Sequence, residues 1–177
     1  MTNAESRDAW PRQEQRGLWY DEMNVGVVYV HRPGRTMTEY DNILFSSLSM
    51  NPQALHVDIA FARSLEPFRK PLVNSMFTLA TLVGMSVSHL TRGTIVANLG
   101  FSDVRFPNPV FHGDTIYGQT VVMGKRPSAS RPAAGIVTME HTATKQDGTV
   151  VAIAVRQVMV RRGPSPSLTA GRPRGRQ

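Results

Sequence analysis

Apolar and polar positions along the chain follow two different patterns, and each predicts a different kind of element. Residues 75–90, SMFTLATLVGMSVSHL, are apolar nearly all the way round, which predicts a helix enclosed by the rest of the protein. Four later segments are rich in β-branched residues and predict strands over residues 94–103, 114–125, 135–145 and 149–161. Gln146-Asp147-Gly148, between the last two strands, is typical of a hairpin turn.

The part of the chain before this helix is less regular. We expect a strand over residues 24–32 that ends in a turn at Arg32-Pro33-Gly34. Short helices are predicted over residues 38–49, with Thr38 as the N-cap, and over residues 57–65. One buried helix with a strand before it and four strands after it predicts an α+β fold. In such a fold an antiparallel β-sheet wraps around a long central α-helix.

The charge of the chain is unevenly distributed. The protein has 177 residues, enough for one domain, with 41% hydrophobic residues and a formal net charge of +7. The first 160 residues carry a net charge of only +2. The remaining excess comes from Arg161, Arg162, Arg172, Arg174 and Arg176. We therefore predict no nucleic-acid partner, because the body shows neither a basic stripe nor an aromatic-rich binding motif.

Several classes of site are excluded by composition. The absence of cysteine excludes a disulfide scaffold, a thiol nucleophile and a Cys-ligated metal. The five histidines show no HExxH or His-x-His clustering, so no metal site is predicted. Residues 1–16 contain no apolar signal segment, and the longest apolar stretch, residues 76–87, is too short to span a bilayer. We therefore expect a cytoplasmic protein with no membrane partner.

Residues 49–58, SMNPQALHVD, carry the most informative motif. They resemble the hydratase motif of the MaoC-like, (R)-specific enoyl-CoA hydratase family, Asp-x-Asn-Pro-x-His followed by an apolar residue and Asp. In this match Asn51 occupies the position of the catalytic Asp, Gln53 that of the Asn, and His56 that of the catalytic His. Similar segments recur over residues 19–162, at residues 34–36, 97–100 and 109–115. The resemblance implies the hotdog fold.

The amides at positions 51 and 53 resemble a particular branch of that family. This branch hydrates dicarboxylic acyl thioesters such as itaconyl-CoA or mesaconyl-CoA, and its motif is Asn-x-Gln-Pro-x-His. The resemblance implies a hydro-lyase that adds water reversibly across the double bond of a short enoyl-CoA. It implies no cofactor, because coenzyme A is part of the substrate, and it implies a homodimer or larger homo-oligomer with sheets joined edge to edge.

The chemistry of hydration assigns roles to the motif residues. Adding water to an α,β-unsaturated thioester needs a base, an acid for the α-carbon and donors for the enolate oxygen. A histidine imidazole can both accept and donate a proton, so His56 can be the general acid/base. Asn51 has no accessible basic form, so we assign it to orienting the water, while Gln53 either assists or shapes the loop. An Asp at position 51 would repel a substrate carboxylate, which gives a reason for the amide.

The start of the central helix is the candidate site for the thioester oxygen. Asn74-Ser75 stands where the family has His-Gly, and the glycine N–H there binds the thioester carbonyl, so the resemblance assigns this role to the Ser75 N–H. Backbone donors at a helix N-terminus suit a developing negative charge. We expect Asn74 to shape this site. Plain N-capping by Asn74 or Ser75 is equally compatible with the sequence.

Residues 125–132, KRPSASRP, form the compact basic cluster of the body and resemble a run in the same branch. Guanidinium groups suit the phosphates of coenzyme A. The predicted CoA-binding residues are Lys125, Arg126, Ser128, Ser130 and Arg131; the alternative is a solvated hairpin loop. Arg35 is a candidate for binding a substrate carboxylate, with a structural ion pair as the alternative.

The chain is expected to have three parts, and two other functions stay open. The parts are a mobile N-terminal segment (1–18), a MaoC-like hotdog domain (19–162) and a basic disordered tail (163–177).

A hotdog acyl-CoA thioesterase would need a carboxylate on the central helix, and residues 75–90 contain neither Asp nor Glu. A catalytically silent acyl-CoA-binding or regulatory subunit, which has lost the Asp, is the other alternative.

Overall fold

The described part of the chain, residues 10–164 of a computed structural model, consists of five strands and a set of helices. The helical segments are η1 (Tyr20–Glu22), α1 (Glu39–Leu48), α2 (Ala54–Val57), α3 (Ile59–Ser64), α4 (Ser75–Ser86) and the π-helical η2 (Val87–Thr91). The strands are β1 (Val28–Thr36), β2 (Ile95–Arg105), β3 (Thr115–Pro127), β4 (Ala134–Lys145) and β5 (Val150–Arg161).

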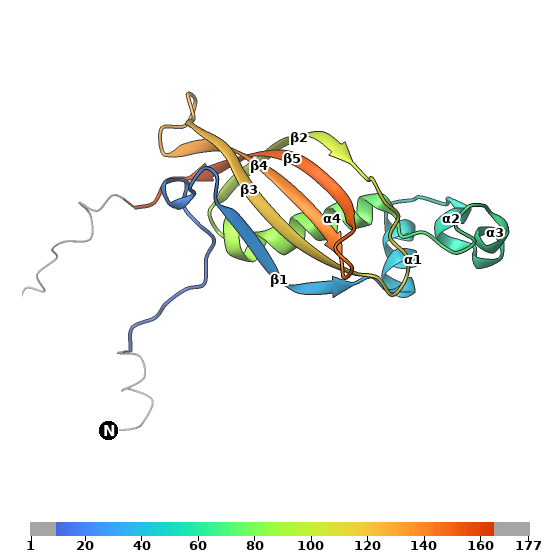
Figure 1. Ribbon diagram of the computed structural model, residues 1–177. Helices are drawn as coiled ribbons and strands as arrows, with labels where there is room; N and C mark the ends of the chain where they lie inside the picture. The colour runs from blue at the N-terminus through green and yellow to red at the C-terminus, as the bar shows by residue number, and fades with distance from the viewer. Residues whose placement is uncertain (1–9, 165–177) are drawn as a thin grey trace, which may run out of the picture.

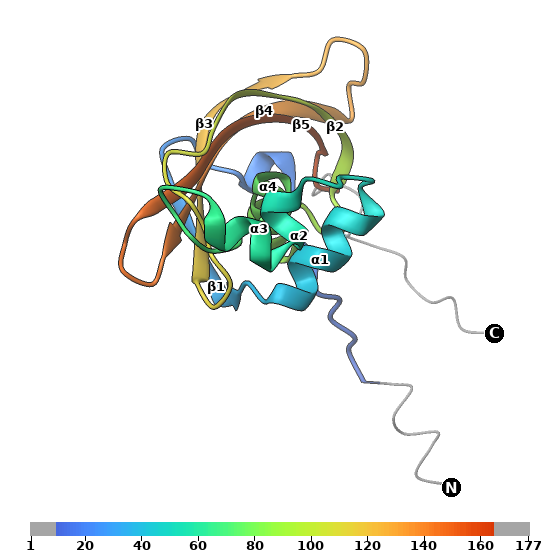
Figure 2. The same cartoon turned by 90° about the vertical axis from the view of Figure 1, so that its right-hand side faces the viewer.

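The strands form a single antiparallel sheet in the order β1-β3-β4-β5-β2. The sheet curves around α4, which lies along its concave face, and the end-on view shows the strands arching over the helix (Figures 1 and 2). Helices α1, α2 and α3 gather at one end of the sheet (Figure 1). This arrangement confirms the predicted hotdog fold.

The space between α4 and the sheet contains two hydrophobic clusters. One includes Tyr20, Leu90 and Val158, and the other, nearer to the short helices, includes Leu82 and Val151. A buried polar row separates them. In this row, Thr120 Oγ1 on β3 lies 2.7 Å from His31 Nε2 on β1 and 2.8 Å from His141 Nδ1 on β4. The concave face is therefore apolar at both ends and polar in the middle.

The first strand differs from the expectation. The sequence predicted a strand over residues 24–32 and a turn at residues 32–34. The observed β1 instead continues through Pro33-Gly34 and ends at Thr36. The register with β3 shifts between His31 and Arg35, so the irregular residues are accommodated as a bulge. Residues 32–34 have no paired partner in β3, so the missing N–H of Pro33 removes no hydrogen bond from the ladder.

The second predicted helix is shorter than expected. Of the expected residues 57–65, α3 covers Ile59–Ser64, and a separate short helix, α2 (Ala54–Val57), precedes it. Asp58 separates them because its side chain accepts a hydrogen bond from the Phe61 N–H at 2.9 Å and caps α3. His56 lies within α2, a short helix that the sequence pattern did not predict.

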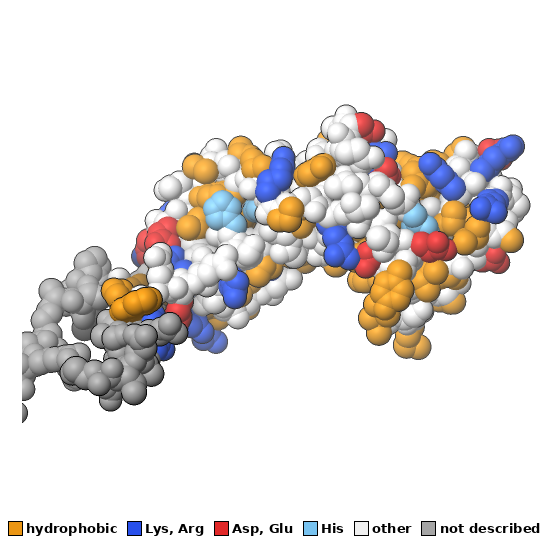
Figure 3. All heavy atoms as spheres, turned by 90° about the horizontal axis from the view of Figure 1, so that it is seen from below, with side chains coloured by type: hydrophobic (Ala, Val, Ile, Leu, Met, Phe, Trp, Pro, Cys, Tyr) orange, Lys and Arg blue, Asp and Glu red, His pale blue; other side chains and the backbone are white. Residues whose placement is uncertain are grey.

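A single chain covers only one side of α4. Thr78, Leu79 and Leu82 are buried against the sheet, whereas Met76 on the opposite side is 53% exposed. The prediction that the rest of the chain encloses this helix is therefore wrong for one copy. Figure 3 views the molecule from this side, and hydrophobic side chains gather there over α1, where Leu48 is 77% exposed.

The expected division of the chain at residues 18 and 162 stays a prediction. Among the described residues, backbone hydrogen bonds begin at Gly17, whose N–H donates to Arg92 O at 2.8 Å. Of the predicted terminal segments, residues 1–9 and 165–177 lie outside the described residues. No helix within residues 10–164 has both the length and the apolar character needed to cross a membrane.

Candidate active site

The loop after α1 places His56 at the end of the sheet. Helix α1 begins at the expected cap, where Thr38 Oγ1 accepts from the Asp41 N–H at 3.2 Å. After the helix, the Asn51 N–H donates to Ser46 O at 2.9 Å, and Asn51 Oδ1 accepts from the Gln53 N–H at 3.1 Å. This Asx turn leads directly into α2, which carries His56.

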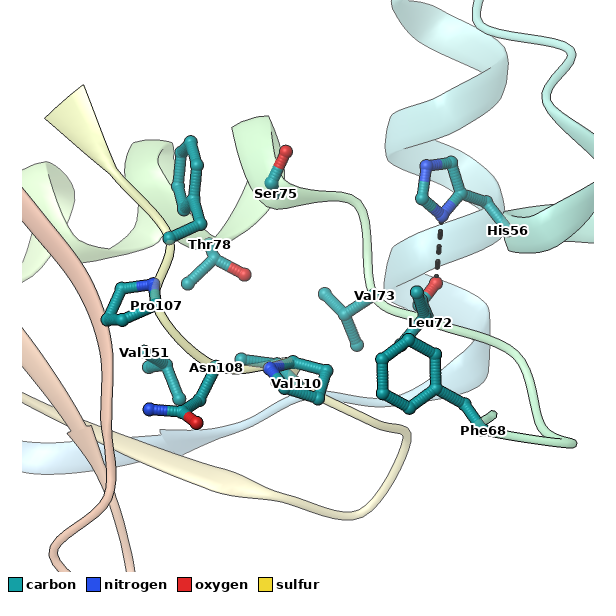
Figure 4. A pocket seen from close by; sticks show the side chains of 12 residues that line it. His56, Phe68, Leu72, Val73, Ser75, Thr78, Pro107, Asn108, Val110 and Val151 are labelled. Carbon is teal, nitrogen blue, oxygen red and sulfur yellow. Dashed lines mark hydrogen bonds between the residues drawn. The ribbon is translucent and has the colours of Figure 1, made fainter. Parts of the chain in front are cut away.

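The imidazole of His56 is held in one tautomer. Its Nδ1 lies 2.9 Å from Leu72 O, and because a carbonyl oxygen can only accept, Nδ1 carries the proton. The neutral ring therefore has its lone pair on Nε2. In Figure 4 the dashed line marks the bond to Leu72, and Nε2 lies on the side of the ring turned toward Ser75. His56 is thus prepared to accept a proton at Nε2.

Ser75 is the first residue of α4 and presents a free backbone donor. Asn74 is the N-cap, and its Oδ1 accepts from the Met76 N–H at 3.0 Å. Among residues 10–164, no acceptor is found for the Ser75 N–H, as expected for the first turn of a helix. The helix dipole adds partial positive charge at this position. The expected N-capping by Asn74 and a free N–H on Ser75 occur together.

His56 and Ser75 line the same cavity, which has a volume of about 330 Å³ (Figure 4). Most of its wall is apolar, with contributions from Phe68, Val73 and Val110. An apolar cavity with a few convergent polar groups is the usual form of a small-molecule site. The cavity therefore combines a proton acceptor and a hydrogen-bond donor in an environment that strengthens electrostatic interactions.

Two of the predicted motif residues do not line this cavity. The Oδ1 atom of Asn51 is engaged in the Asx turn, and Gln53 is exposed beside it. Both residues shape the loop that leads into α2. The assignment of Asn51 to the reacting water therefore stays a prediction, since the amide would have to contact a substrate at the edge of the cavity.

Arg35 also lies outside the His56 cavity. Its Nη2 donates to Asp41 Oδ1 at 2.7 Å, so the alternative of an ion pair is what the structure contains. The pair borders a different groove, along the exposed side of α4, with Phe45 and Phe77 in its wall. The guanidinium also lowers the pKa of Asp41, although the largest cause of this shift is the hydrogen bond from the Thr38 hydroxyl.

The predicted CoA-binding cluster lies at the far end of the sheet. It occupies the hairpin between β3 and β4, whereas α2 with His56 lies at the opposite end (Figure 1). Lys125 Nζ donates to Tyr20 O at 3.2 Å, and Ser128 Oγ accepts from the Arg131 N–H at 3.2 Å. Within one chain the structure does not bring this cluster and His56 together, because β3 extends away from the short helices.

One buried residue of the site was missed by the sequence interpretation. Asn42 on α1 is fully buried, and its side chain contacts the backbone of His56, Leu72 and Asn74 as well as the ring of His112. Burial lowers the pKa of His112, which keeps that ring neutral. The only signal in the sequence was a polar residue on the inward side of a short helix, which no motif distinguished.

The site contains neither of the features that other chemistries would need. Within residues 10–164, no group of three or more His, Asp or Glu side chains could hold a metal ion. Helix α4 and the following η2 carry no carboxylate, so the thioesterase alternative lacks its nucleophile or base on the central helix.

Comparisons with known proteins show which family the chain resembles. Residues 22–145 match the family model described as MaoC like domain. The chain is 32% identical over 146 residues to the beta-methylmalyl-CoA dehydratase of Chloroflexus aurantiacus, covering 82% of this chain and 41% of that protein. It is 29% identical over 157 residues to the mesaconyl-CoA hydratase of Cereibacter sphaeroides, covering 86% and 45%. The chain thus spans less than half the length of either relative.

A solved structure extends the likeness to the whole fold. The MaoC-like dehydratase from Rhodospirillum rubrum superimposes with a TM-score of 0.72 at 26% identity, covering 84% of this chain and 99% of that one. The similarity therefore includes a protein of about one hotdog domain as well as relatives of roughly twice that length.

Proposed function

The chain belongs to the MaoC-like domain family, and on that premise we propose that it is a hydro-lyase acting on a short enoyl-CoA. The observation that carries this proposal is the shared cavity of His56 and Ser75. A ring nitrogen with a free lone pair and a backbone N–H without an acceptor come from residues that line this cavity. Addition of water to an α,β-unsaturated thioester needs a base that can return its proton as an acid, and a donor for the enolate oxygen.

The proposed reaction proceeds through one enolate. His56 Nε2 removes a proton from water, and the water oxygen forms a bond to the β-carbon of the substrate. The electrons of the double bond move toward the thioester oxygen, which accepts a hydrogen bond from the Ser75 N–H. The His56 imidazolium then returns its proton to the α-carbon, and the reverse sequence dehydrates the product. General acid/base chemistry suffices, so we assign no metal or redox cofactor.

The proposed acyl group is dicarboxylic, of the mesaconyl or itaconyl type. The names of two relatives, a mesaconyl-CoA hydratase and a beta-methylmalyl-CoA dehydratase, support this class. Asn51 supports it as well, because an aspartate there would repel a substrate carboxylate at short distance. In the described part of the chain, no Lys or Arg lines the cavity, so a basic partner for that carboxylate has to come from elsewhere.

A second copy of the chain is the proposed source of the missing basic groups. Strand β2 is an edge of the sheet, with Leu99 and Phe101 45% and 40% exposed. Two such edges related by a two-fold axis perpendicular to the sheet pair antiparallel. This pairing would bring the basic β3–β4 hairpin of one copy to the same end as His56 of the other. We therefore propose a homodimer that binds CoA across the interface between its two copies. We also propose that this dimer acts in the cytoplasm.

The test of this function is a hydration assay with crotonyl-, mesaconyl- and itaconyl-CoA. We expect water addition to at least one of the dicarboxylic substrates, and His56→Ala should lower kcat by about 100- to 10,000-fold. His89→Ala is the matched control, because His89 lies on η2, away from the cavity, and should retain activity. A wild-type protein inert on all three substrates would support the silent-subunit alternative; activity on crotonyl-CoA alone would contradict the dicarboxylic assignment.

A further inference from the structure

We propose that Asn42 is a positioning residue that orients the general base and the oxyanion donor through one side chain. This inference rests on the proposed hydratase function and adds a residue to it. Asn42 does not line the cavity and touches no reacting atom. Its effect is exerted through the peptide groups next to His56 and Ser75.

The carboxamide of Asn42 is fully engaged inside the protein. Its Nδ2 lies 3.1 Å from His56 O and 3.0 Å from Leu72 O, and its Oδ1 accepts from the Asn74 N–H at 2.7 Å. The orientation of the amide is unambiguous, because a flipped group would point its oxygen at two carbonyl oxygens. One buried side chain therefore links α1, α2 and the segment that leads into α4.

The first consequence concerns the tautomer of His56. Leu72 O accepts from both His56 Nδ1 and Asn42 Nδ2, and a carbonyl oxygen has two lone pairs for the two donors. Asn42 also holds the carbonyl of His56 itself. The ring and its acceptor are therefore tied to the same amide, which keeps the proton on Nδ1 and the lone pair on Nε2.

The second consequence concerns the start of α4. Asn42 Oδ1 fixes the N–H of Asn74, and Asn74 Oδ1 in turn caps the Met76 N–H. The peptide between these two bonds carries the Ser75 N–H. A displacement of about 1 Å in such a group can lower a rate by about 100-fold, so a single amide that sets both catalytic groups is a sensitive point.

The last contact of the Asn42 amide is with a titratable side chain, that of His112. Asn42 Nδ2 also lies 3.1 Å from His112 Nε2. The amide has only two hydrogens for three nearby acceptors, His56 O, Leu72 O and His112 Nε2, so a hydrogen is shared among them. Because an NH2 group donates only, His112 Nε2 carries no proton in this contact and the ring is neutral. The ionisable groups facing this position are His56 on α2, His112 before β3 and Glu39, whose charge acts on His112. A carboxylate at position 42 would favour the protonated form of both histidines.

The experiment compares Asn42→Ala, Asn42→Asp and the control Thr120→Val in the full chain, on the best acyl-CoA substrate. Thr120 is a buried residue of the polar row, so its loss tests destabilisation alone. We expect Asn42→Ala to lower kcat by about 10- to 100-fold with a smaller change in KM. Asn42→Asp should move the acidic limb of the kcat/KM profile to higher pH. Thr120→Val should retain kcat at temperatures where it is folded.

A second measurement is independent of activity. In nitrogen NMR spectra of labelled histidine, wild-type His56 should show a protonated Nδ1 and a bare Nε2, and Asn42→Ala should mix the two tautomers. A wild-type protein with this signature but no hydration activity would refute the proposed function while leaving the positioning role. An Asn42→Ala protein with unchanged kcat and an unchanged His56 tautomer would overturn the inference. An equal loss of kcat in Asn42→Ala and in Thr120→Val would also overturn the inference.

Discussion

His56 and Ser75 line one cavity although they belong to different helices, α2 and α4, which are separated in the chain by α3 and a loop. The segment between Leu72 and Asn74 holds them in place, since Leu72 O accepts from His56 and Asn74 caps the helix that Ser75 begins. In this arrangement His56 Nε2 can act as a base and the Ser75 N–H can stabilise a developing negative charge. It also makes the backbone of Ser75, rather than its hydroxyl, the group to be tested.

Replacing Ser75 with proline should remove the donor and keep the helix. Proline is tolerated at the first position of a helix, and the backbone of Asn74 (φ −56°, ψ 124°) already suits a residue that precedes proline. Loss of one oxyanion donor lowers kcat by about 100- to 1,000-fold. Ser75→Ala keeps the N–H and is the matched control. Steady-state kinetics in which both variants behave alike would refute the backbone role.

Asn51→Asp should change substrate preference. If the amide avoids repulsion with a substrate carboxylate, the aspartate should lower kcat/KM for mesaconyl-CoA relative to crotonyl-CoA. The ratio of kcat/KM for the two substrates is the measurement, because it cancels any general loss of activity. Asn51→Ser is a useful control, since a serine can also accept from the Gln53 N–H without adding charge. An unchanged ratio in Asn51→Asp would eliminate the electrostatic explanation.

The buried histidines predict that stability falls at acidic pH. Burial lowers the pKa of His31 to about 4 and that of His141 to about 3, with smaller contributions from neighbouring positive charges. Below pH 6.5 the unfolded chain binds protons that the folded chain does not. Stability should therefore decrease as the pH falls from 6.5 toward 4, by an amount on the order of a few kcal/mol.

Urea denaturation between pH 7.5 and 4.5 measures this effect. In His141→Gln one of the two titrating rings is absent, so the free energy of unfolding should depend less steeply on pH than in the wild type. Comparing the two slopes removes the contribution of the carboxylates, which titrate in both proteins. Parallel curves would show that His141 does not remain neutral in the folded state.

Gly135 should be indispensable for the packing of Tyr20. A Cβ atom at position 135 would lie 2.1 Å from Tyr20 Cε2, inside the core cluster. Gly135→Ala should therefore destabilise the protein by about 1–3 kcal/mol, as overpacking commonly does. Gly124→Ala is the control, because no atom lies within 4 Å of its added Cβ. Equal thermal unfolding midpoints for the two variants would contradict this account.

Most of the fold was predictable because strand patterns are local. In β4, buried and partly buried positions alternate over residues 135–144, and this period of two is visible in the sequence. The pattern misled at β1, where Pro33-Gly34 has the composition of a turn. The ring of Tyr117 lies so close to Gly34 that an added Cβ would be 2.5 Å away. The tight contact with β3, which a local pattern cannot contain, keeps this dipeptide in the strand.

For the site, the sequence by itself determined which residue types were available. The motif that resembles the MaoC-like family made His56 a candidate, and the same resemblance made the Ser75 N–H at the start of the buried helix another. Only the tertiary structure decided that Leu72 selects the tautomer of His56 and that Asn42 joins both groups. It also decided that the basic hairpin lies at the far end of the sheet (Figure 1). The reason is physical: local patterns specify the period and the chemistry of side chains, whereas hydrogen-bond partners distant in the chain exist only after α1, α2 and α4 have packed together.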